Sequence, residues 1–173
     1  MNSLLQFAAQ RRRPLNLGGA TACAAILAMA LYLQHGFGLE PCPLCMFQRV
    51  GVAVLGVVFL LAWLHHPGRF GAGVYAALIA LAALATAAIA GRHIYVQLAP
   101  AGSIPACGAP LDAMLRMFPI TKVIDKVLRG SGECSKIDWS LLGLSLPWWV
   151  LIAVLALGIA GVVVNLVRPK ATR

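Results

Sequence analysis

Residues 40–64 read EPCPLCMFQRVGVAVLGVVFLLAWL. Two cysteines, Cys42 and Cys45, stand directly before a long apolar run that only Gln48 and Arg49 interrupt with strongly polar side chains. The run over 44–64 has about the 20 residues that an α-helix needs to cross the hydrocarbon core of a bilayer. The stretch therefore predicts a membrane-spanning helix that begins beside a C-x-x-C pair.

Three more apolar runs flank this one, over residues 15–33, 71–91 and 146–167. Backbone N–H and C=O groups in lipid must be satisfied within their own segment, which favours helices. Of the 173 residues, 61% are hydrophobic and only 11% are charged, against about 25% charged in a typical soluble domain. We expect an all-α membrane protein with one integral domain over 1–173, built as a four-helix transmembrane bundle.

The first apolar run has a rival interpretation as a cleaved signal peptide. Arg11, Arg12 and Arg13 precede it, and an Ala28-Met29-Ala30 triplet lies within it, as at many cleavage sites. The apolar residues continue past the triplet to Leu33. This continuation favours an uncleaved membrane anchor.

The distribution of charge predicts the orientation of the chain. The formal net charge is +9, and basic residues without acidic ones occupy three segments: 11–13, 65–69 and 168–173. Cytoplasmic flanks of membrane helices accumulate Lys and Arg, so we expect both termini inside and the loops over 34–43 and 97–145 outside. The basic residues form no patch interleaved with aromatic residues, so we expect the lipid bilayer, and no nucleic acid, as the partner of this charge.

The long second loop contains one helical pattern. Apolar residues recur at Ile120, Val123, Ile124, Val127 and Leu128, with polar and charged residues between them. This spacing predicts a short extracytoplasmic amphipathic helix. Helices of this kind lie on membrane surfaces, which we favour over the alternative of a helix packed on the core of the loop itself.

Four of the five cysteines fall on the expected outer side. Cys42 and Cys45 adjoin the first loop, and Cys107 and Cys134 lie in the second. Disulfides form and persist outside the cytosol, so the two pairs are either redox-active or structural. Cys23 lies in the middle of the first span, where a small packing residue is the expected role.

Other uses of the cysteines fit less well. Structural zinc sites usually combine a C-x-x-C pair with a second closely spaced pair, whereas Cys107 and Cys134 are far apart in the sequence. We therefore expect no metal. A c-type haem needs His directly after C-x-x-C, and Met46 occupies that position. A C-x-x-C disulfide closes a very short loop and constrains the unfolded chain little, which favours chemistry over structure.

The position of Cys45 favours a reactive thiol. If the second helix begins near Pro43 or Leu44, Cys45 lies in its first turn, where free N–H groups and the helix dipole favour a thiolate. Arg49 follows one turn later on the same face. Its cation could reach the headgroups instead, but an ionisable residue inside a span is functional by default. A dithiol there can pass electrons to a lipid-soluble acceptor, and a guanidinium can bind the carbonyl oxygen of a quinone.

Three stretches carry a resemblance to a known family. They are PCPLCMFQR at 41–49, RHIYVQLAP at 92–100 and WSLLGLSLPWW at 139–149. With four spans, C-x-x-C after the first, and two spaced cysteines in a long second loop, nearly the whole chain resembles the disulfide bond formation protein B (DsbB) family. The resemblance implies a membrane thiol oxidase of the bacterial inner membrane, a quinone-dependent protein-disulfide oxidoreductase with its redox loops in the periplasm.

The resemblance also implies partners and roles. A DsbA-like periplasmic thiol oxidase of thioredoxin fold is the expected partner, and ubiquinone or menaquinone the electron acceptor. Cys107 would form the mixed disulfide with the partner, and Cys134 would be its bonded companion. Electrons would pass to Cys42 and Cys45 through a transient Cys42–Cys134 disulfide, and Cys45 would react with the quinone.

Two further residues take roles from the same resemblance. Arg49 matches a quinone-contacting arginine of the family by its spacing from Cys45, and His93 matches a quinone-contacting histidine near the end of the third span. By position alone, His93 could instead be an ordinary interfacial histidine.

Two other protein classes compete with this interpretation. Vitamin K epoxide reductase-like enzymes share four helices and quinone chemistry, but their C-x-x-C lies near the start of the last core helix, whereas here it precedes the second. The other alternative is a non-catalytic membrane protein with structural disulfides or a cysteine metal site. That class would leave Arg49 beside Cys45 without a role.

Overall fold

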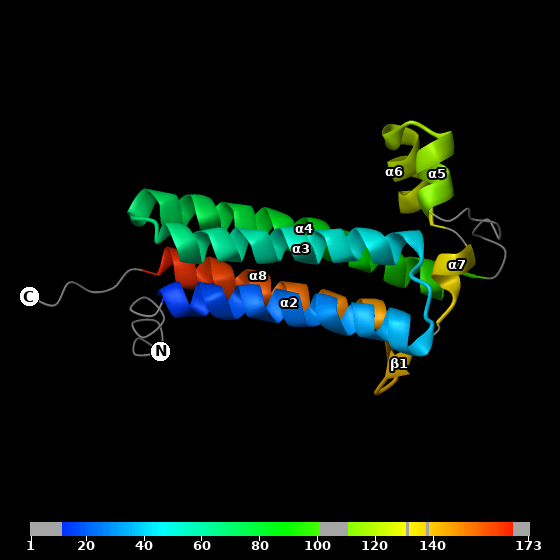
Figure 1. Cartoon of the computed structure of the whole chain (residues 1–173), viewed down its shortest axis with the longest axis horizontal. Helices are drawn as coiled ribbons and strands as arrows, with labels where there is room; N and C mark the ends of the chain where they lie inside the picture. Colours follow the sequence, from blue (N-terminus) through cyan, green and yellow to red (C-terminus); the bar gives the residue numbers. More distant parts are fainter. Residues whose placement is uncertain (1–11, 101–110, 131, 138, 168–173) are drawn as a thin grey trace, which may run out of the picture.

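Four long helices form the body of the protein. The computed structural model describes residues 12–100, 111–130, 132–137 and 139–167. The long helices are α2 (Arg12–Phe37), α3 (Pro43–His65), α4 (Arg69–Leu98) and α8 (Leu146–Leu166). Each is long and apolar enough to cross a membrane, and they run alongside one another (Figure 1). The predicted all-α four-helix bundle is confirmed.

The helix α4 differs most from the apolar run that predicted it. That run ends at Gly91, but the helix continues to Leu98. The added turns bury His93, Ile94 and Val96, because they pack against loop elements and against α3 rather than lipid. Hydropathy therefore underestimates the length of this helix at its C-terminal end, which carries His93.

The chain between α4 and α8 forms several short elements. They are α5 (Leu111–Met117), α6 (Ile120–Arg129), α7 (Gly132–Ser135), β1 (Ser140–Leu141) and β2 (Leu144–Ser145). All gather at one end of the bundle, the right-hand end in Figure 1. The hairpin of β1 and β2 was not expected from the sequence. Its turn places Leu142 at φ 53° and Gly143 at φ 78°, as a type I′ turn requires.

The predicted amphipathic helix is present as α6. Val123 and Val127 are buried, whereas Ile120, Ile124 and Leu128 are exposed. The buried valines belong to a cluster that we call the outer core, made of Leu44, Val96, Met114, Val123, Val127 and Cys134. One part of the apolar face thus packs on a core that the loop shares with the ends of α3 and α4, which is closer to the alternative that the sequence favoured less. Contact of the rest with the membrane surface stays a prediction.

A second cluster, the inner core, holds the bundle together along its length. Its members are Cys23, Val52, Leu55, Phe59, Ile79, Ala83 and Val154. The Phe59 ring lies between Gly19 of α2 and Gly161 of α8, where an added Cβ would come within 2.8 Å and 2.6 Å of ring carbons. Glycine at both positions lets the helices approach this ring closely. Cys23 is 1% exposed, as expected for a packing residue.

The end of the bundle away from the short elements contains a buried amide pair. Asn16 of α2 donates to Asn165 of α8 at 3.3 Å, and Asn165 donates back at 3.0 Å. The beginning of α2, the end of α8 and the turn between α3 and α4 all lie at this end (Figure 1). Arg12 joins two of them, because its guanidinium donates to the carbonyl of Pro67 at 3.4 Å.

Candidate functional site

The C-x-x-C pair forms the beginning of α3. The helix starts at Pro43, and Cys42 is its N-cap residue with extended backbone. Proline suits this first position because a missing N–H costs nothing there. The two sulfurs lie 3.3 Å apart, beyond the length of about 2.05 Å of a disulfide. The pair is therefore a dithiol in this structure, close enough to oxidise with little movement.

The helix N-terminus acts on the pair differently from the sequence-based expectation. We expected free N–H groups of the first turn to favour the Cys45 sulfur. In the structure the N–H of Cys45 donates to the sulfur of Cys42, at 3.4 Å. Cys42, as the N-cap residue, is thus the cysteine whose sulfur receives this helix donor.

His93, from the extended end of α4, contacts both sulfurs. Its Nε2 lies 3.7 Å from the Cys42 sulfur, and its Nδ1 lies 3.9 Å from the Cys45 sulfur. The ring is only 2% exposed. The sequence placed His93 near the site by resemblance alone, and the structure places its ring beside the dithiol.

Hydrogen bonds define the protonation of the His93 ring. Nε2 lies 3.1 Å from the carbonyl oxygen of Cys134, and because a carbonyl only accepts, Nε2 carries a hydrogen. Nδ1 of the neutral ring then accepts from the side-chain amide of Gln48, at 2.9 Å. The single lone pair of the ring nitrogen that lies nearest Cys45 is therefore occupied by the Gln48 amide.

Gln48 is the site residue that sequence reasoning missed. It is buried, at 3% exposed, and it was noted only as a polar interruption of the apolar run. A signal was available, because Gln48 follows Cys45 by one helical turn, and residues at that spacing share a face. A buried amide on the face of a reactive cysteine needs a polar partner, and that partner is His93.

Arg49 is held by α2. Its guanidinium donates to the side-chain oxygen of Gln34 and, at 3.0 Å, to the carbonyl of Ala30. The side chain thus crosses from α3 to the neighbouring helix α2. Both contacts fix the cation at the wall of the cleft that Cys45 also lines.

A cleft brings the candidate residues together. Its polar lining consists of Gln34, Glu40, Cys42, Cys45, Gln48, Arg49, His93, Gln97 and Lys136. Its apolar wall includes Ile26, Leu27, Val52 and Val150. Apolar walls combined with convergent polar groups are typical of small-molecule sites.

Of the two remaining predicted cysteines, the structure describes only Cys134. Cys134 is 1% exposed in the outer core, against which Cys42 also packs. Cys107 lies outside the described residues. The structure thus brings Cys42, Cys45, Arg49 and His93 to one cleft, with Cys134 beside it.

The sulfurs of Cys42 and Cys45 and a ring nitrogen of His93 could also act as ligands of a metal ion. Cys42, Cys45 and His93 offer one ligand atom each, all within 4.8 Å of one another. Thiolate sulfur and imidazole nitrogen are ligands that Zn²⁺ accepts. Only the reduced pair could serve in this way, because both sulfurs are used up when they form a disulfide.

A buried histidine beside two thiols, at the end of a four-helix membrane bundle, defines a membrane-bound dithiol redox protein. Residues 12–164 match the family described as disulfide bond formation protein DsbB. The chain belongs to this family. It is therefore a disulfide bond formation protein with several membrane-spanning helices.

Individual relatives agree with this assignment. The "Disulfide bond formation protein B" of Methylococcus capsulatus is 48% identical over 140 residues, covering 81% of this chain and 85% of the relative. The protein of the same name from Nitrosococcus oceani is 48% identical over 141 residues, covering 82% and 83%. That of Azoarcus sp. is 48% identical over 143 residues, covering 83% and 86%.

Proposed function

We propose that this protein is a quinone-dependent thiol oxidase that reoxidises a DsbA-like periplasmic oxidase of thioredoxin fold. Electrons pass from that partner to ubiquinone or menaquinone. The observation that carries the proposal is the cleft where Cys45, His93 and Arg49 meet beneath apolar walls. A dithiol alone could serve structure, but a dithiol that opens on an apolar cleft with a fixed cation suits a lipid-soluble acceptor.

The proposed location is the bacterial inner membrane, with both termini in the cytoplasm. Arg12, Arg13 and Arg69 lie at the end of the bundle away from the short elements, where a cytoplasmic surface would favour them. The loops over 34–43 and 97–145, with the dithiol, are then periplasmic.

The first exchange takes place between the partner and the second loop. A thiolate of the partner attacks Cys107 of a Cys107–Cys134 disulfide, and the S–S bond breaks with Cys134 leaving as the thiolate. The second thiol of the partner then displaces Cys107. The partner gains a disulfide, and the loop holds two thiols and the two electrons.

The second exchange transfers these electrons to the C-x-x-C pair. Cys134 attacks Cys42 of a Cys42–Cys45 disulfide and releases Cys45, and Cys107 then displaces Cys42 to restore the loop disulfide. The pair is left as the dithiol that the structure contains. When bound, a quinone supplies the acceptor, because it takes two electrons and two protons from the pair and becomes the quinol.

The surrounding residues assist the last step. His93 Nδ1 lies 3.9 Å from the Cys45 sulfur and would take up the thiol proton after the Gln48 amide, which donates to its single lone pair, moves away. Arg49 is in position to bind a carbonyl oxygen on which negative charge develops. Gln48 holds the imidazole, and the apolar wall offers a surface on which a quinone ring would pack.

Quinone absorbance tests the proposal. Detergent-purified protein is mixed with a ubiquinone or menaquinone analogue and a reduced thioredoxin-fold oxidase. We expect catalytic loss of quinone absorbance in the wild type and none in Cys45→Ser. Cys23→Ala is the matched control, because it removes a buried thiol away from the site, and it should retain turnover.

The opposite results would favour the alternative protein class. A folded wild-type sample that turns over neither analogue would overturn the proposal. If Cys45→Ser instead lowered the melting temperature strongly, this result would favour a structural disulfide or a metal site.

A further inference from the structure

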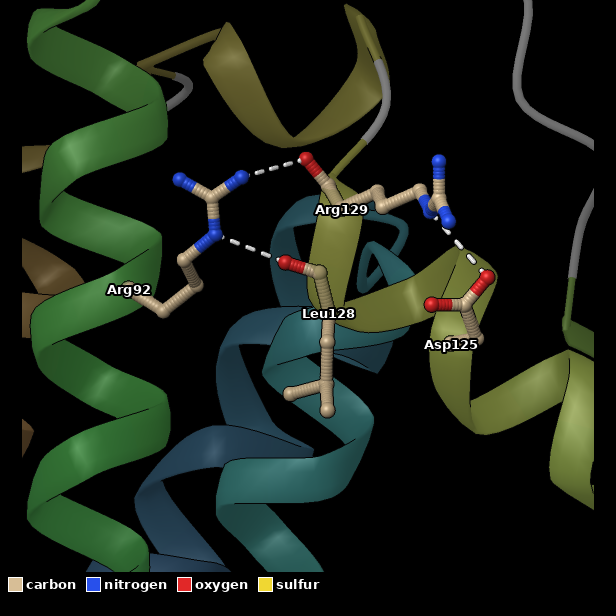
Figure 2. A network of polar contacts seen from close by, with 4 residues as sticks. All are labelled: Arg92, Asp125, Leu128 and Arg129. Carbon is tan, nitrogen blue, oxygen red and sulfur yellow. Dashed lines mark hydrogen bonds and ion pairs between the residues drawn. The ribbon is translucent and has the colours of Figure 1, made fainter.

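Arg92, the residue before His93 on α4, caps a helix of the second loop. Its Nε and one terminal nitrogen each lie 2.7 Å from a carbonyl oxygen, of Leu128 and Arg129 respectively. Figure 2 shows the guanidinium reaching from α4 to the end of α6. The last carbonyls of a helix have no partner within the helix, and a cation there is also favoured by the helix dipole. Arg92 therefore fastens the end of α6 to α4.

The turn that follows α6 lies directly on α4. Gly130 has φ +83°, and a Cβ there would come within 2.7 Å of a Val96 methyl group. Its N–H closes the helix by donating to the carbonyl of Val127 at 3.0 Å. Glycine is needed here both for the positive φ and for the close approach, so the exit from α6 is placed against the helix that bears His93.

The same stretch of loop is held again a few residues later. Cys134 is buried in the outer core, and its carbonyl accepts from His93. Two consecutive residues of α4, Arg92 and His93, thus hold the segment from Leu128 to Cys134 at its two ends. Cys42 packs against the cluster that contains Cys134.

We infer that Arg92 is a positioning residue for the exchange between the loop and the C-x-x-C pair. By capping α6 on α4 it keeps Cys134 beside Cys42, which receives the electrons. The inference rests on the proposed function, because it assigns Arg92 to one of the two exchanges described above. Quinone reduction by the Cys42–Cys45 pair itself does not need this contact.

Two assays separate the exchanges. The first follows quinone reduction driven by the reduced thioredoxin-fold oxidase, which requires the loop. The second uses a Cys107→Ser/Cys134→Ser background, in which dithiothreitol reduces the Cys42–Cys45 pair directly. Arg92→Met should slow the first by about tenfold, since two hydrogen bonds to a charged donor are lost. It should leave the second unchanged.

Matched variants distinguish capping from charge. Arg129→Gln removes a positive charge from the same helix end, where Arg129 pairs with Asp125 at 3.0 Å on an exposed surface (Figure 2). Exposed pairs of this kind contribute little, so both rates should match the wild type. Arg92→Lys keeps the charge without the paired donors and should restore the partner-driven rate only in part.

Disulfide trapping tests the position of Cys134 without turnover. In a Cys45→Ser/Cys107→Ser background, a mild oxidant joins Cys42 to Cys134, and Arg92→Met should slow this joining. The inference would be overturned if Arg92→Met slowed both quinone assays equally. It would also be overturned if Arg92→Met changed neither the partner-driven assay nor the trapping. Absence of quinone reduction in the wild type would instead overturn the proposed function, and trapping would still test Arg92.

Discussion

The inner and outer cores are both buried and apolar, yet they are built from different parts of the chain. The inner core joins side chains of the four long helices around Phe59. The outer core joins the ends of α3 and α4 to the short loop helices, and it contains Cys134. Polar groups adjoin it directly, because His93 binds the Cys134 carbonyl and Gln48 binds His93.

Because of this difference, we expect the inner core to determine mainly the stability of the protein and the outer core to affect mainly its chemistry. A substitution in the inner core, except at Val52, which also lines the cleft, removes packing between helices and leaves the sulfurs of Cys42 and Cys45 in place. A substitution next to the outer core changes the contacts of the reacting groups and removes little packing. The two regions should therefore respond to mutation in different measurements, and three variants test that separation.

The largest expected effect is in the inner core. Phe59→Ala should lower the free energy of unfolding by about 3–5 kcal/mol, because it leaves a large cavity between the helices. Phe70→Ala is the matched control, since Phe70 is 88% exposed. Thermal unfolding in detergent measures both. If Phe59→Ala reduced turnover of the folded protein without loss of stability, the proposed division of roles between the inner and outer cores would be wrong.

A smaller effect is expected at the buried amide pair. Asn165→Leu should cost about 1–3 kcal/mol of unfolding free energy, because it leaves the Asn16 amide buried without this partner. The double variant Asn16→Leu/Asn165→Leu should recover most of the loss, since no polar group is then left unpaired, and the adjacent cavity lined by Asn16 and Gly161 offers room. Urea unfolding of the wild type, the single variants Asn16→Leu and Asn165→Leu, and the double variant gives the coupling energy, and simple additivity would contradict the pairing.

The smallest energetic effect should have the clearest chemical readout. Gln48→Leu removes the donor to His93 Nδ1 and should slow quinone reduction by about tenfold, which corresponds to about 1.4 kcal/mol in the barrier. The dithiothreitol-driven assay measures this step. Gln48→Asn, which keeps an amide donor on a shorter side chain, should retain more activity than Gln48→Leu. Wild-type rates in Gln48→Leu would show that the amide does not position the ring.

Hydropathy predicted the long helices well because each is a self-contained hydrogen-bonded segment with apolar side chains facing lipid. It failed where the environment changes from lipid to protein. The turns of α4 after Gly91 carry Arg92 and His93, which are polar, yet they stay helical because loop residues satisfy them. The hairpin was missed because its strands are two residues long and its turn contains Leu142 in the left-handed region.

The candidate site could be predicted only in part. The C-x-x-C pair and Arg49 are close in sequence, so helical geometry alone brings them together. His93 and Cys134 required the family resemblance, because no local pattern indicates which distant segments meet. The Gln48–His93 and Arg92–Leu128 contacts were not predicted, since the first depends on how α3 packs against α4 and the second on how α6 packs against α4.

The length of α4 has a consequence for depth in the bilayer. The helix has 30 residues, or about 45 Å at about 1.5 Å per residue, whereas the hydrocarbon layer is about 30 Å thick. Arg92 lies about 35 Å along it from Arg69 at the same rise. With Arg69 at the edge of the hydrocarbon layer, the dithiol beside His93 lies in the headgroup layer, a boundary between two solvents. Under the proposed function, the water-soluble partner would reach the sulfurs from one side, and the quinone would bring only its ring to them from the other.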